Sequence, residues 1–573
     1  MIILPVHPEN ERQNSSGLPD KTVNGIIESL GPDATLITIG DVIGLVHSHK
    51  VLSALQYHLW ISIKRKTVRY SPDNSFLPHC HFGALVHTKY KGSLQHTLTR
   101  IQYTYCPSCK KTSKDYGGKK HTYNSYGTLI SDVWRDICCD PDKDLSPVFR
   151  RFSDLFGLEF YNELRVMDCR SLLPEPEKQS LKNPSPQYSV QAGFQNVFMD
   201  KIRSQSRLIQ GDCIGKMRNI QDDSVDFAFA DPPYNLGKKY NNYADDLSVR
   251  EYFSWCDQWI KELARILRPG RTLALLNIPL WAIRHFLYLE TVLEFQNWIS
   301  WEALSFPVRK IMPAHYAILC FSKGKPRPLP GFSGTSGTFD IPGSSGTFLP
   351  LEPLAEWYCL RAGCVKKRNS DAMTDRGQLT DLWWDIHRLK HNSRRVDHPC
   401  QVPPQLMYRL ISVFTQPGET VLDCFNGAGT STLAAHQCGR KYIGIELSEK
   451  YHDISRIRHE EICRGIDPFR KSNRELTEKN SPVARLPKKK YEIPKKTLQL
   501  EVRRVARQLG CLPKREDIIK LGKYPIKYYD EYFFSWGEVC AAARHEGMSE
   551  TSKEDPVFQK SEKKSGQIGL FSE

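Results

Sequence analysis

Four consecutive residues, Asp231, Pro232, Pro233 and Tyr234, place a carboxylate, a stiff turn and an aromatic ring directly after the apolar run 224–230. The exocyclic amine of adenine or cytosine is a poor nucleophile, because its lone pair is delocalised into the ring. A carboxylate and a backbone carbonyl can accept its two N–H bonds and localise that lone pair. The prolines hold the backbone that presents the carbonyl, and the tyrosine offers a flat face to a base rotated out of a duplex. The alternative is an ordinary proline turn after a strand.

A second group of residues lies in a turn between two further predicted strands and at the end of the second one. The group consists of Asp423, Phe425, Asn426, Gly427, Gly429, Thr430 and Glu446. Glycines let the backbone approach a ligand closely, and an acidic residue about 20 positions further on can bind both hydroxyls of a ribose. The pattern predicts a nucleoside cofactor. A dinucleotide is the alternative, but the turn is shorter than the dinucleotide fingerprint and a cofactor without pyrophosphate needs no phosphate cradle.

The elements that must position these groups alternate between apolar extended runs and helical stretches. This alternation fills 197–463 and predicts an α/β domain with a largely parallel sheet, interrupted by an insertion at 325–395 that begins with a Gly/Ser/Pro-rich segment. The remaining predicted parts are an N-terminal domain (1–190), a basic linker (464–496), a helical module (497–548) and a disordered tail (549–573).

Between residues 200 and 460 the chain resembles the β class of amino-methyltransferases, in which the Asp-Pro-Pro-Tyr block precedes the Phe-x-Gly-x-Gly block. The motifs LIQGDCIGKM, SVDFAFADPPYNLG, HPCQVPPQLMYRLI, ETVLDCFNGAGTSTLAA and RKYIGIELSEKY carry the resemblance. It implies a Rossmann-like sheet with permuted motif order. It also implies that S-adenosylmethionine binds to the second group of residues and to Asp212, which would meet the adenine of the cofactor, while 231–234 line the pocket of the target base.

The resemblance implies a reaction in which the methyl group passes directly to the N6 amine of an adenine in a specific DNA sequence. Aspartate at the head of the tetrapeptide, with Asn235 after it, favours adenine in such families. The alternatives are a cytosine-N4 enzyme, a non-catalytic DNA-binding protein with a relic site, and an RNA substrate. Direct transfer needs no covalent intermediate, so Cys213, Cys400 and Cys424 are interpreted as small buried residues.

Charge and hydropathy point to the partners. Lys and Arg outnumber Asp and Glu by 80 to 64, and the net charge of +16 favours a polyanion such as double-stranded DNA. The sequence contains no apolar run of about 18 residues, so no membrane segment is expected and the protein is predicted to be cytoplasmic. A cognate restriction enzyme is a further candidate partner.

The N-terminal part repeats the pattern of the α/β domain. Residues 29–62 align with 266–300, residues 77–89 with 311–323, and residues 146–156 with 404–414. In the same register, Asp132, Trp134, Asp136 and Ile137 match Asp381, Trp383, Asp385 and Ile386, and Cys106 and Cys109 fall where Cys359 and Cys364 fall. We interpret 20–160 as a degenerate methyltransferase copy that lacks both halves of the site and packs against the active copy as an internal pseudo-dimer. An unrelated target-recognition domain is the alternative.

Cysteines and histidines in the N-terminal part leave a metal site open. Cys106 and Cys109 have the C-x-x-C spacing of zinc ligands, and Cys80, Cys138, Cys139, His79 and His81 are near in sequence. The second C-x-x-C pair of a zinc ribbon is missing, so the sequence alone does not assign a metal to the protein.

The module at 497–548 resembles the small helical repeat appended to homing endonucleases, through VARQLGCLPKREDI, GKYP and FFSWGEVCAAA. The resemblance implies a DNA-binding accessory, in which the phosphate contacts are Arg503, Arg504, Lys514 and Arg515. A core of Leu509, Tyr524, Phe533 and Trp536 is expected with or without such a role.

Overall fold

The computed structural model describes most of the predicted elements. The described residues fall mainly in 34–90, 128–156, 202–236, 247–303, 314–332, 377–387, 401–469 and 495–533, with short pieces between, among them 2–4, 105–106, 109–112, 166–168 and 364. The greater part of the predicted linker, the predicted tail, Cys359 and Cys400 lie outside the described residues. None of the helices described is long and apolar enough to cross a membrane.

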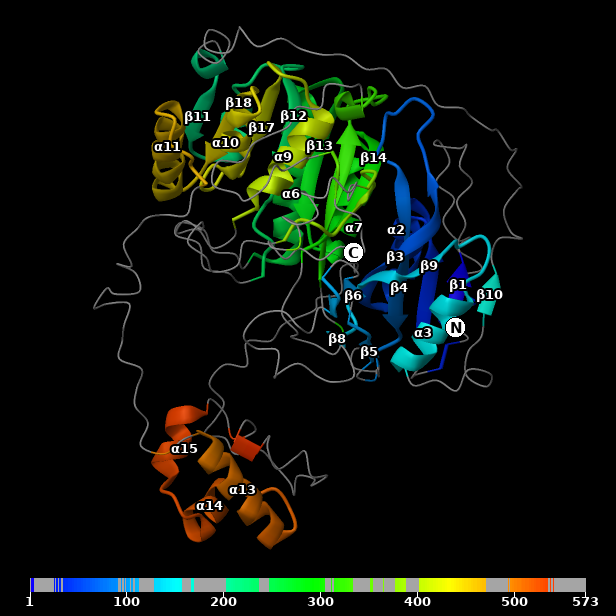
Figure 1. Ribbon diagram of the computed structural model, residues 1–573, viewed down its shortest axis with the longest axis vertical. Coiled ribbons are helices and arrows are strands. Elements are labelled where there is room, and N and C mark those ends of the chain that lie inside the picture. The colour runs from blue at the N-terminus through cyan, green and yellow to red at the C-terminus, as the bar shows by residue number, and fades with distance from the viewer. Residues whose placement is uncertain are drawn as a thin grey trace. The chain divides into compact units, whose positions relative to one another are not determined.

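The chain divides into two compact units, of which Met1–Lys471 belongs to the first and Ser472–Ile568 is the second. The first unit contains an eight-stranded sheet in the order β11-β18-β17-β12-β13-β15-β14-β16 (Figure 1). The strands are β11 (Arg207–Gln210), β12 (Val225–Ala230), β13 (Leu267–Asn277), β14 (Glu294–Glu302), β15 (His315–Ser322), β16 (Leu382–Trp383), β17 (Thr420–Asp423) and β18 (Lys441–Glu446). All neighbouring strands are parallel except for β15, which runs antiparallel to β13 and β14. The sheet confirms the α/β prediction and is mixed because of this one strand.

Helices pack on both faces of this sheet. One core cluster joins it to α5 (Cys213–Met217), α6 (Val249–Ile266) and α7 (Pro279–Leu289), and another joins it to α9 (Pro404–Phe414) and α10 (Thr430–Gln437). Helix α11 (Glu449–Cys463) follows β18. Helix α6 begins at Ser248, whose hydroxyl accepts a hydrogen bond from the Glu251 amide, and the Glu251 carboxylate accepts one in return from the Ser248 amide. This doubly bonded first turn fixes the start of the helix that later supports the candidate site.

The N-terminal part of the same unit forms a six-stranded sheet in the order β10-β1-β2-β4-β3-β9. Its elements are β1 (Ile2–Leu4), β2 (Thr35–Gly40), α2 (Val42–Val51), β3 (Gln56–Arg69), β4 (His79–Thr88), β9 (Val133–Cys139), α3 (Ser146–Phe156) and β10 (Val166–Asp168). Strand directions follow β17-β12-β13-β15-β14-β16 one for one, with β4 antiparallel to both of its neighbours. Smaller strands pair as β5 (Arg100–Ile101) with β8 (Thr128–Leu129) and β6 (Tyr105–Cys106) with β7 (Lys111–Thr112).

The two sheets agree in register as well as in order. Thr35 pairs with Thr88, as Thr272 pairs with Ser322, and these are the positions that the sequence repeat aligns. Ser62 opposite Gly83 likewise corresponds to Ser300 opposite Ala317. A slip of one residue would turn every side chain to the other face, so shared register means shared core positions.

The N-terminal sheet begins earlier than the repeat seen in the sequence, because β1 lies beside β2 as β12 lies beside β13. Ile2 pairs with Ile37, and the equivalent pair in the larger sheet is Phe229 with Ala274. Counting on along both strands places Leu4 at the position of Asp231.

Equivalent residues of the two sheets meet each other across their interface. The indoles of Trp60 and Trp298 stack with centroids 4.4 Å apart, and the hydroxyl oxygens of Ser62 and Ser300 lie 2.8 Å apart. Both tryptophans are almost fully buried. These two pairs lie where a pseudo-two-fold axis relates the halves.

Two ion pairs repeat the same relationship away from that axis. His81 Nδ1 lies 3.0 Å from Asp381 Oδ1, and the equivalent His315 Nδ1 lies 3.0 Å from Asp132 Oδ2. Burial alone would raise the pKa of Asp381, but His81 and His79 outweigh it and hold that pKa below its usual range. Reciprocal contacts of this kind are those of an isologous interface.

The second unit contains α13 (Lys495–Leu509), α14 (Arg515–Leu521) and α15 (Ile526–Tyr532). Phe533 is buried in their shared core, and Tyr524 and Trp536 pack against it, as predicted. The prediction for Leu509 is wrong, because it is the last residue of α13 and remains 37% exposed.

Each half of the first unit carries the same tryptophan, aspartate and arginine arrangement. Arg409 donates to both oxygens of Asp385, at 2.7 and 2.8 Å, and its guanidinium lies over Trp383. In the N-terminal half Arg151 donates to both oxygens of Asp136, at 2.8 and 2.6 Å, and lies over Trp134. The pairs differ in exposure, since the side chains of Arg409 and Asp385 are 0% and 5% exposed and those of Arg151 and Asp136 are 17% and 43% exposed.

This matched pair predicts a difference in stability. Asp385→Ala removes the carboxylate that pairs with a buried guanidinium and should lower the free energy of unfolding by about 3–5 kcal/mol. Asp136→Ala removes the partly solvated ion pair with Arg151 and should lower the free energy of unfolding by about 0–1 kcal/mol. Urea unfolding of the two variants measures both values, and equal costs would contradict the assigned difference in burial.

Candidate functional site

The candidate site lies at the edge of the large sheet where β12 and β17 end side by side. Phe229 pairs with Asp423 in parallel register, so the chain leaves β12 at Asp231 next to the last residue of β17. The adjoining strand β18 ends at Glu446. Residues far apart in the sequence therefore converge at the carboxyl ends of parallel strands, which is the usual place for ligands in open α/β sheets.

Side chains from two helices hold the tetrapeptide after β12. The Tyr252 hydroxyl donates to the Pro233 carbonyl at 2.8 Å, and Trp281 Nε1 donates to the Tyr234 carbonyl at 2.8 Å. The Tyr234 hydroxyl donates to Asp231 Oδ1 at 2.9 Å. Sequence patterns did not reveal the roles of Tyr252 and Trp281, because both lie on the apolar faces of helices and match ordinary core residues.

The glycine turn between β17 and α10 needs the left-handed backbone that only glycine adopts readily. Gly427 and Gly429 have φ of 50° and 82°. A Cβ atom on Gly429 would lie 2.3 Å from Ser455 Oγ. The Gly427 amide donates to Glu446 Oε2 at 2.7 Å, and the Ser448 amide donates to Oε1 at 2.8 Å. The acidic residue at the end of β18 is thus tied directly to the turn.

The other predicted residues of this turn take different places. The ring of Phe425 contacts Trp255 and Trp259 edge to face, at centroid distances of 5.7 and 5.2 Å. The side-chain amide of Asn426 donates from Nδ2 to Ser455 Oγ at 3.0 Å. Its Oδ1 accepts a hydrogen bond from the Thr432 hydroxyl at 2.9 Å. Asn426 is buried, so its side chain braces the turn against α10 and α11. Thr430 is buried as the first residue of α10.

Asp212 lies at the same edge of the sheet through β11. The last residue of β11, Gln210, pairs with Glu446, and the Gly211 amide donates to the Glu446 carbonyl at 2.9 Å. The Asp212 carboxylate accepts from the Gly215 amide at 2.8 Å and caps α5. Its side chain is exposed, as a group must be to meet a ligand.

Three carboxylates converge on this edge, and the pKa of one of them is strongly perturbed. The pKa of Asp423 is raised to about 7, chiefly by burial and also by the charges of Asp231 and Glu446, while hydrogen bonds from Ser431 and the backbone amide of Phe425 act in the opposite direction. Burial also raises the pKa of Glu446. A ligand that brings hydroxyl donors and a positive charge would relieve both the repulsion and the unfavourable burial.

Two cysteines near the site do not have the character of nucleophiles. Burial raises the pKa of Cys213 to about 12 and raises that of Cys424 well above its usual value. Both therefore remain thiols, and a thiol is a poor nucleophile. This agrees with their interpretation as small buried residues.

Residues 225–456 match the family model described as DNA methylase, N6_N4 type. A type II methyltransferase of Bacillus amyloliquefaciens, M.BamHI, is 34% identical over 42% of this chain, which spans about half (54%) of that protein's length. M.HpaI of Haemophilus parainfluenzae is 27% identical, with 46% of this chain and 76% of that protein covered. The solved PvuII DNA methyltransferase, described as cytosine-N4-specific, is 18% identical, with 44% of this chain and 85% of that chain covered and a TM-score of 0.32.

The pKa of Asp423 predicts a pH effect on stability. The pKa is raised from 3.8 to about 7 in the folded protein, so between these values the folded state holds a proton that the unfolded state has lost. The stabilisation is therefore complete below about pH 4 and is lost as the pH rises through 7. Asp423→Asn should remove this loss.

Thermal melts of the ligand-free wild type and Asp423→Asn between pH 5 and 8 test the effect. The melting temperature of the wild type should fall relative to that of the variant as the pH rises. Ser431→Ala removes a hydrogen bond that favours the ionised form, so its fall should be larger than that of the wild type. Parallel curves for wild type and Asp423→Asn would refute the assignment.

Proposed function

We propose that the protein transfers a methyl group from S-adenosylmethionine to an exocyclic amine of a DNA base. The observation that carries this proposal is the convergence of Asp231 with Asp423 and Glu446 at one sheet edge, inside the segment that matches the DNA methylase family. One carboxylate can hold the amine while the others hold the cofactor. Because only part of the chain matches, the activity of the whole protein is a proposal.

The glycine turn and its acidic neighbours suit S-adenosylmethionine. The two left-handed glycines form a tight turn that is bonded to Glu446, and Glu446, at the end of β18, is in the position to bind ribose hydroxyls. Asp212 is exposed at the same edge for the adenine ring. Asp423 and Phe425 complete the site, and the raised pKa of Asp423 suits a cationic ligand. Asn426 and Thr430 contribute through the backbone of the turn, because both residues are buried.

The chain's own residues perform the chemistry at the amine. Bound S-adenosylmethionine supplies an electrophilic methyl group on a sulfonium. Asp231 and the Pro232 carbonyl accept the two N–H bonds of the amine, which localises its lone pair for attack. The Tyr234 hydroxyl donates to Asp231 Oδ1 and orients this carboxylate. After transfer, Asp231 accepts the proton that the alkylated nitrogen releases, and most of the rate enhancement comes from positioning.

We propose adenine N6 as the acceptor within a specific site in double-stranded DNA, with the base rotated out of the helix. Aspartate before the two prolines and Asn235 after Tyr234 support adenine. Asn235 has a left-handed φ of 53°. Its side-chain amide donates to the Leu247 carbonyl at 2.8 Å, so this residue shapes the turn. A cognate restriction enzyme remains a proposed partner.

The N-terminal half is proposed to be a degenerate copy that acts as a built-in partner. Its sheet repeats the order and register of the large one. Leu4 stands where Asp231 stands, so this position of the copy offers no carboxylate to an amine. Among the described residues, we assign the chemistry to the site after β12 alone, and the reciprocal contacts across the interface support a pseudo-dimer.

Incubation of diverse DNA with the protein and methyl-labelled S-adenosylmethionine, followed by mass spectrometry of nucleosides, tests the reaction. N6-methyladenine is expected. Asp231→Ala should lower its rate of formation by about 10²–10³ or more, since an oriented acceptor is lost. Asp136→Asn, on the surface of the N-terminal half, should retain activity. N4-methylcytosine would correct the base, and no methylated nucleoside in DNA would refute the proposal.

The cofactor site has its own test. Glu446→Gln keeps an oxygen for the Gly427 amide but removes the charge, so S-adenosylmethionine should bind about tenfold more weakly, a loss of about 1.4 kcal/mol. Isothermal titration calorimetry of the two proteins measures the ratio. Unchanged affinity would remove Glu446 from the cofactor site.

A further inference from the structure

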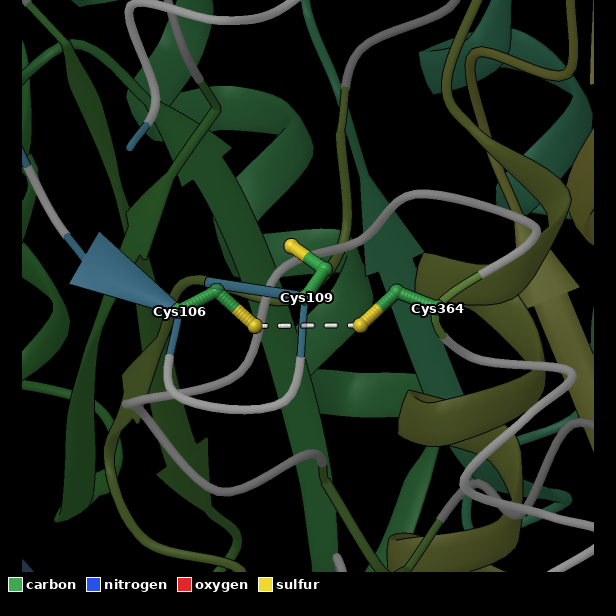
Figure 2. A group of neighbouring side chains, drawn as sticks. All are labelled: Cys106, Cys109 and Cys364. Atoms are coloured by element: carbon green, nitrogen blue, oxygen red, sulfur yellow. Dashed lines mark hydrogen bonds between the residues drawn. The ribbon is translucent and has the colours of Figure 1, made fainter. Parts of the chain in front are cut away.

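The two halves of the first unit each contribute thiols to one small cluster. Cys106 and Cys109 come from the N-terminal half, and Cys364 comes from the segment between β15 and β16 (Figure 2). We propose that these three cysteines bind a structural zinc ion that joins the two halves of the chain.

The distance between the sulfur atoms of Cys106 and Cys364 is that of two thiolates on one metal ion. The three Sγ atoms all lie within 4.8 Å of one another, and Cys106 Sγ is 3.7 Å from Cys364 Sγ. Two thiolates bound tetrahedrally to zinc at about 2.3 Å lie about 3.8 Å apart. A disulfide would need about 2.05 Å. The observed spacing therefore fits a shared metal ion and not a sulfur–sulfur bond.

The local backbone brings the first two thiols together. Cys106 ends β6 and pairs with Lys111 of β7, so Cys109 lies in the turn of this hairpin. Lys110 has a left-handed φ of 52°, an uncommon conformation for a residue with a side chain. It reverses the chain directly after Cys109. The C-x-x-C spacing thus acquires the geometry of a metal-binding turn.

The third thiol arrives through the pseudo-symmetry of the unit. In the sequence, the β6–β7 hairpin falls between β4 and β9, and Cys364 falls between the equivalent strands β15 and β16. Cys106 and Cys364 are both buried, at 2% and 7% exposure, while Cys109 is partly exposed. Thiols from equivalent segments meet because a two-fold relationship brings equivalent segments together.

An all-sulfur donor set selects the metal. Thiolates prefer zinc or iron–sulfur clusters over hard cations such as Mg²⁺ and Ca²⁺. Structural zinc is bound by four ligands, and the three thiols supply three of them.

Four of the other candidate donors from the sequence make contacts elsewhere. His79 and His81 both bond to Asp381. The thiols of Cys80 and Cys138 donate to the Thr380 hydroxyl and the Arg65 carbonyl. The zinc site thus consists of the hairpin and the insertion, and its metal would link segments that the sequence separates widely.

Metal analysis of the purified full chain tests the proposal. About one zinc ion per chain is expected, by mass spectrometry of the elements. Cys106→Ser and Cys364→Ser should each lose most of the bound zinc, because each removes one of the three thiols. Cys463→Ser, at the exposed end of α11, should keep a full complement.

A second measurement does not depend on the folding of the variants. Wild-type protein stripped with a chelator and loaded with Co²⁺ should show intense thiolate-to-cobalt absorption, and its melting temperature should fall on stripping and recover with Zn²⁺. The absence of zinc together with no cobalt spectrum would overturn the proposal, as would a Cys106–Cys364 disulfide found by peptide mapping of the protein purified under reducing conditions.

Discussion

The parallel pairing of β12 with β17 is the contact on which the candidate site depends. It places Asp231 beside Asp423, and β18 then adds Glu446 on the other side. The pKa of Asp423 is raised chiefly because this carboxyl is buried, and the charges of Asp231 and Glu446 add to the effect. The Gly427 amide donates to the Glu446 carboxylate. Burying a carboxyl beside other carboxylates is unfavourable in the ligand-free protein. Groups with perturbed pKa values concentrate at functional sites, where a bound ligand can interact favourably with them.

The second organising feature is the interface between two sheets of the same order. Trp60 against Trp298 and Ser62 against Ser300 are contacts of a position with its own equivalent. The interface and the proposed chemistry place independent demands on the chain, since the interface needs packing while the proposed reaction needs a carboxylate at one position. The N-terminal sheet has the packing residues of the interface. At the position of the Asp231 carboxylate it has Leu4.

The same relationship explains why thiols distant in the sequence converge. Segments at equivalent places in two related halves meet only where they lie near the axis between the halves. Cys106 and Cys364 meet in this way, at 3.7 Å. The metal proposed there would stabilise the arrangement by closing a long loop of chain, and metal binding of this kind contributes directly to folding free energy.

The sequence by itself determined the strands, the turns after β12 and β17, and the repeat, because each depends on alternation and spacing within a short window. It could not reveal that Tyr252 and Trp281 hold the tetrapeptide, because a core tyrosine and a functional one look the same in a helical pattern. It assigned Leu509 to a core that ends one helical turn earlier. Only the tertiary structure decided that Asn426 braces the turn and that Cys364 joins the hairpin cysteines. These contacts depend on which strands become neighbours, and that choice is made by packing across hundreds of residues.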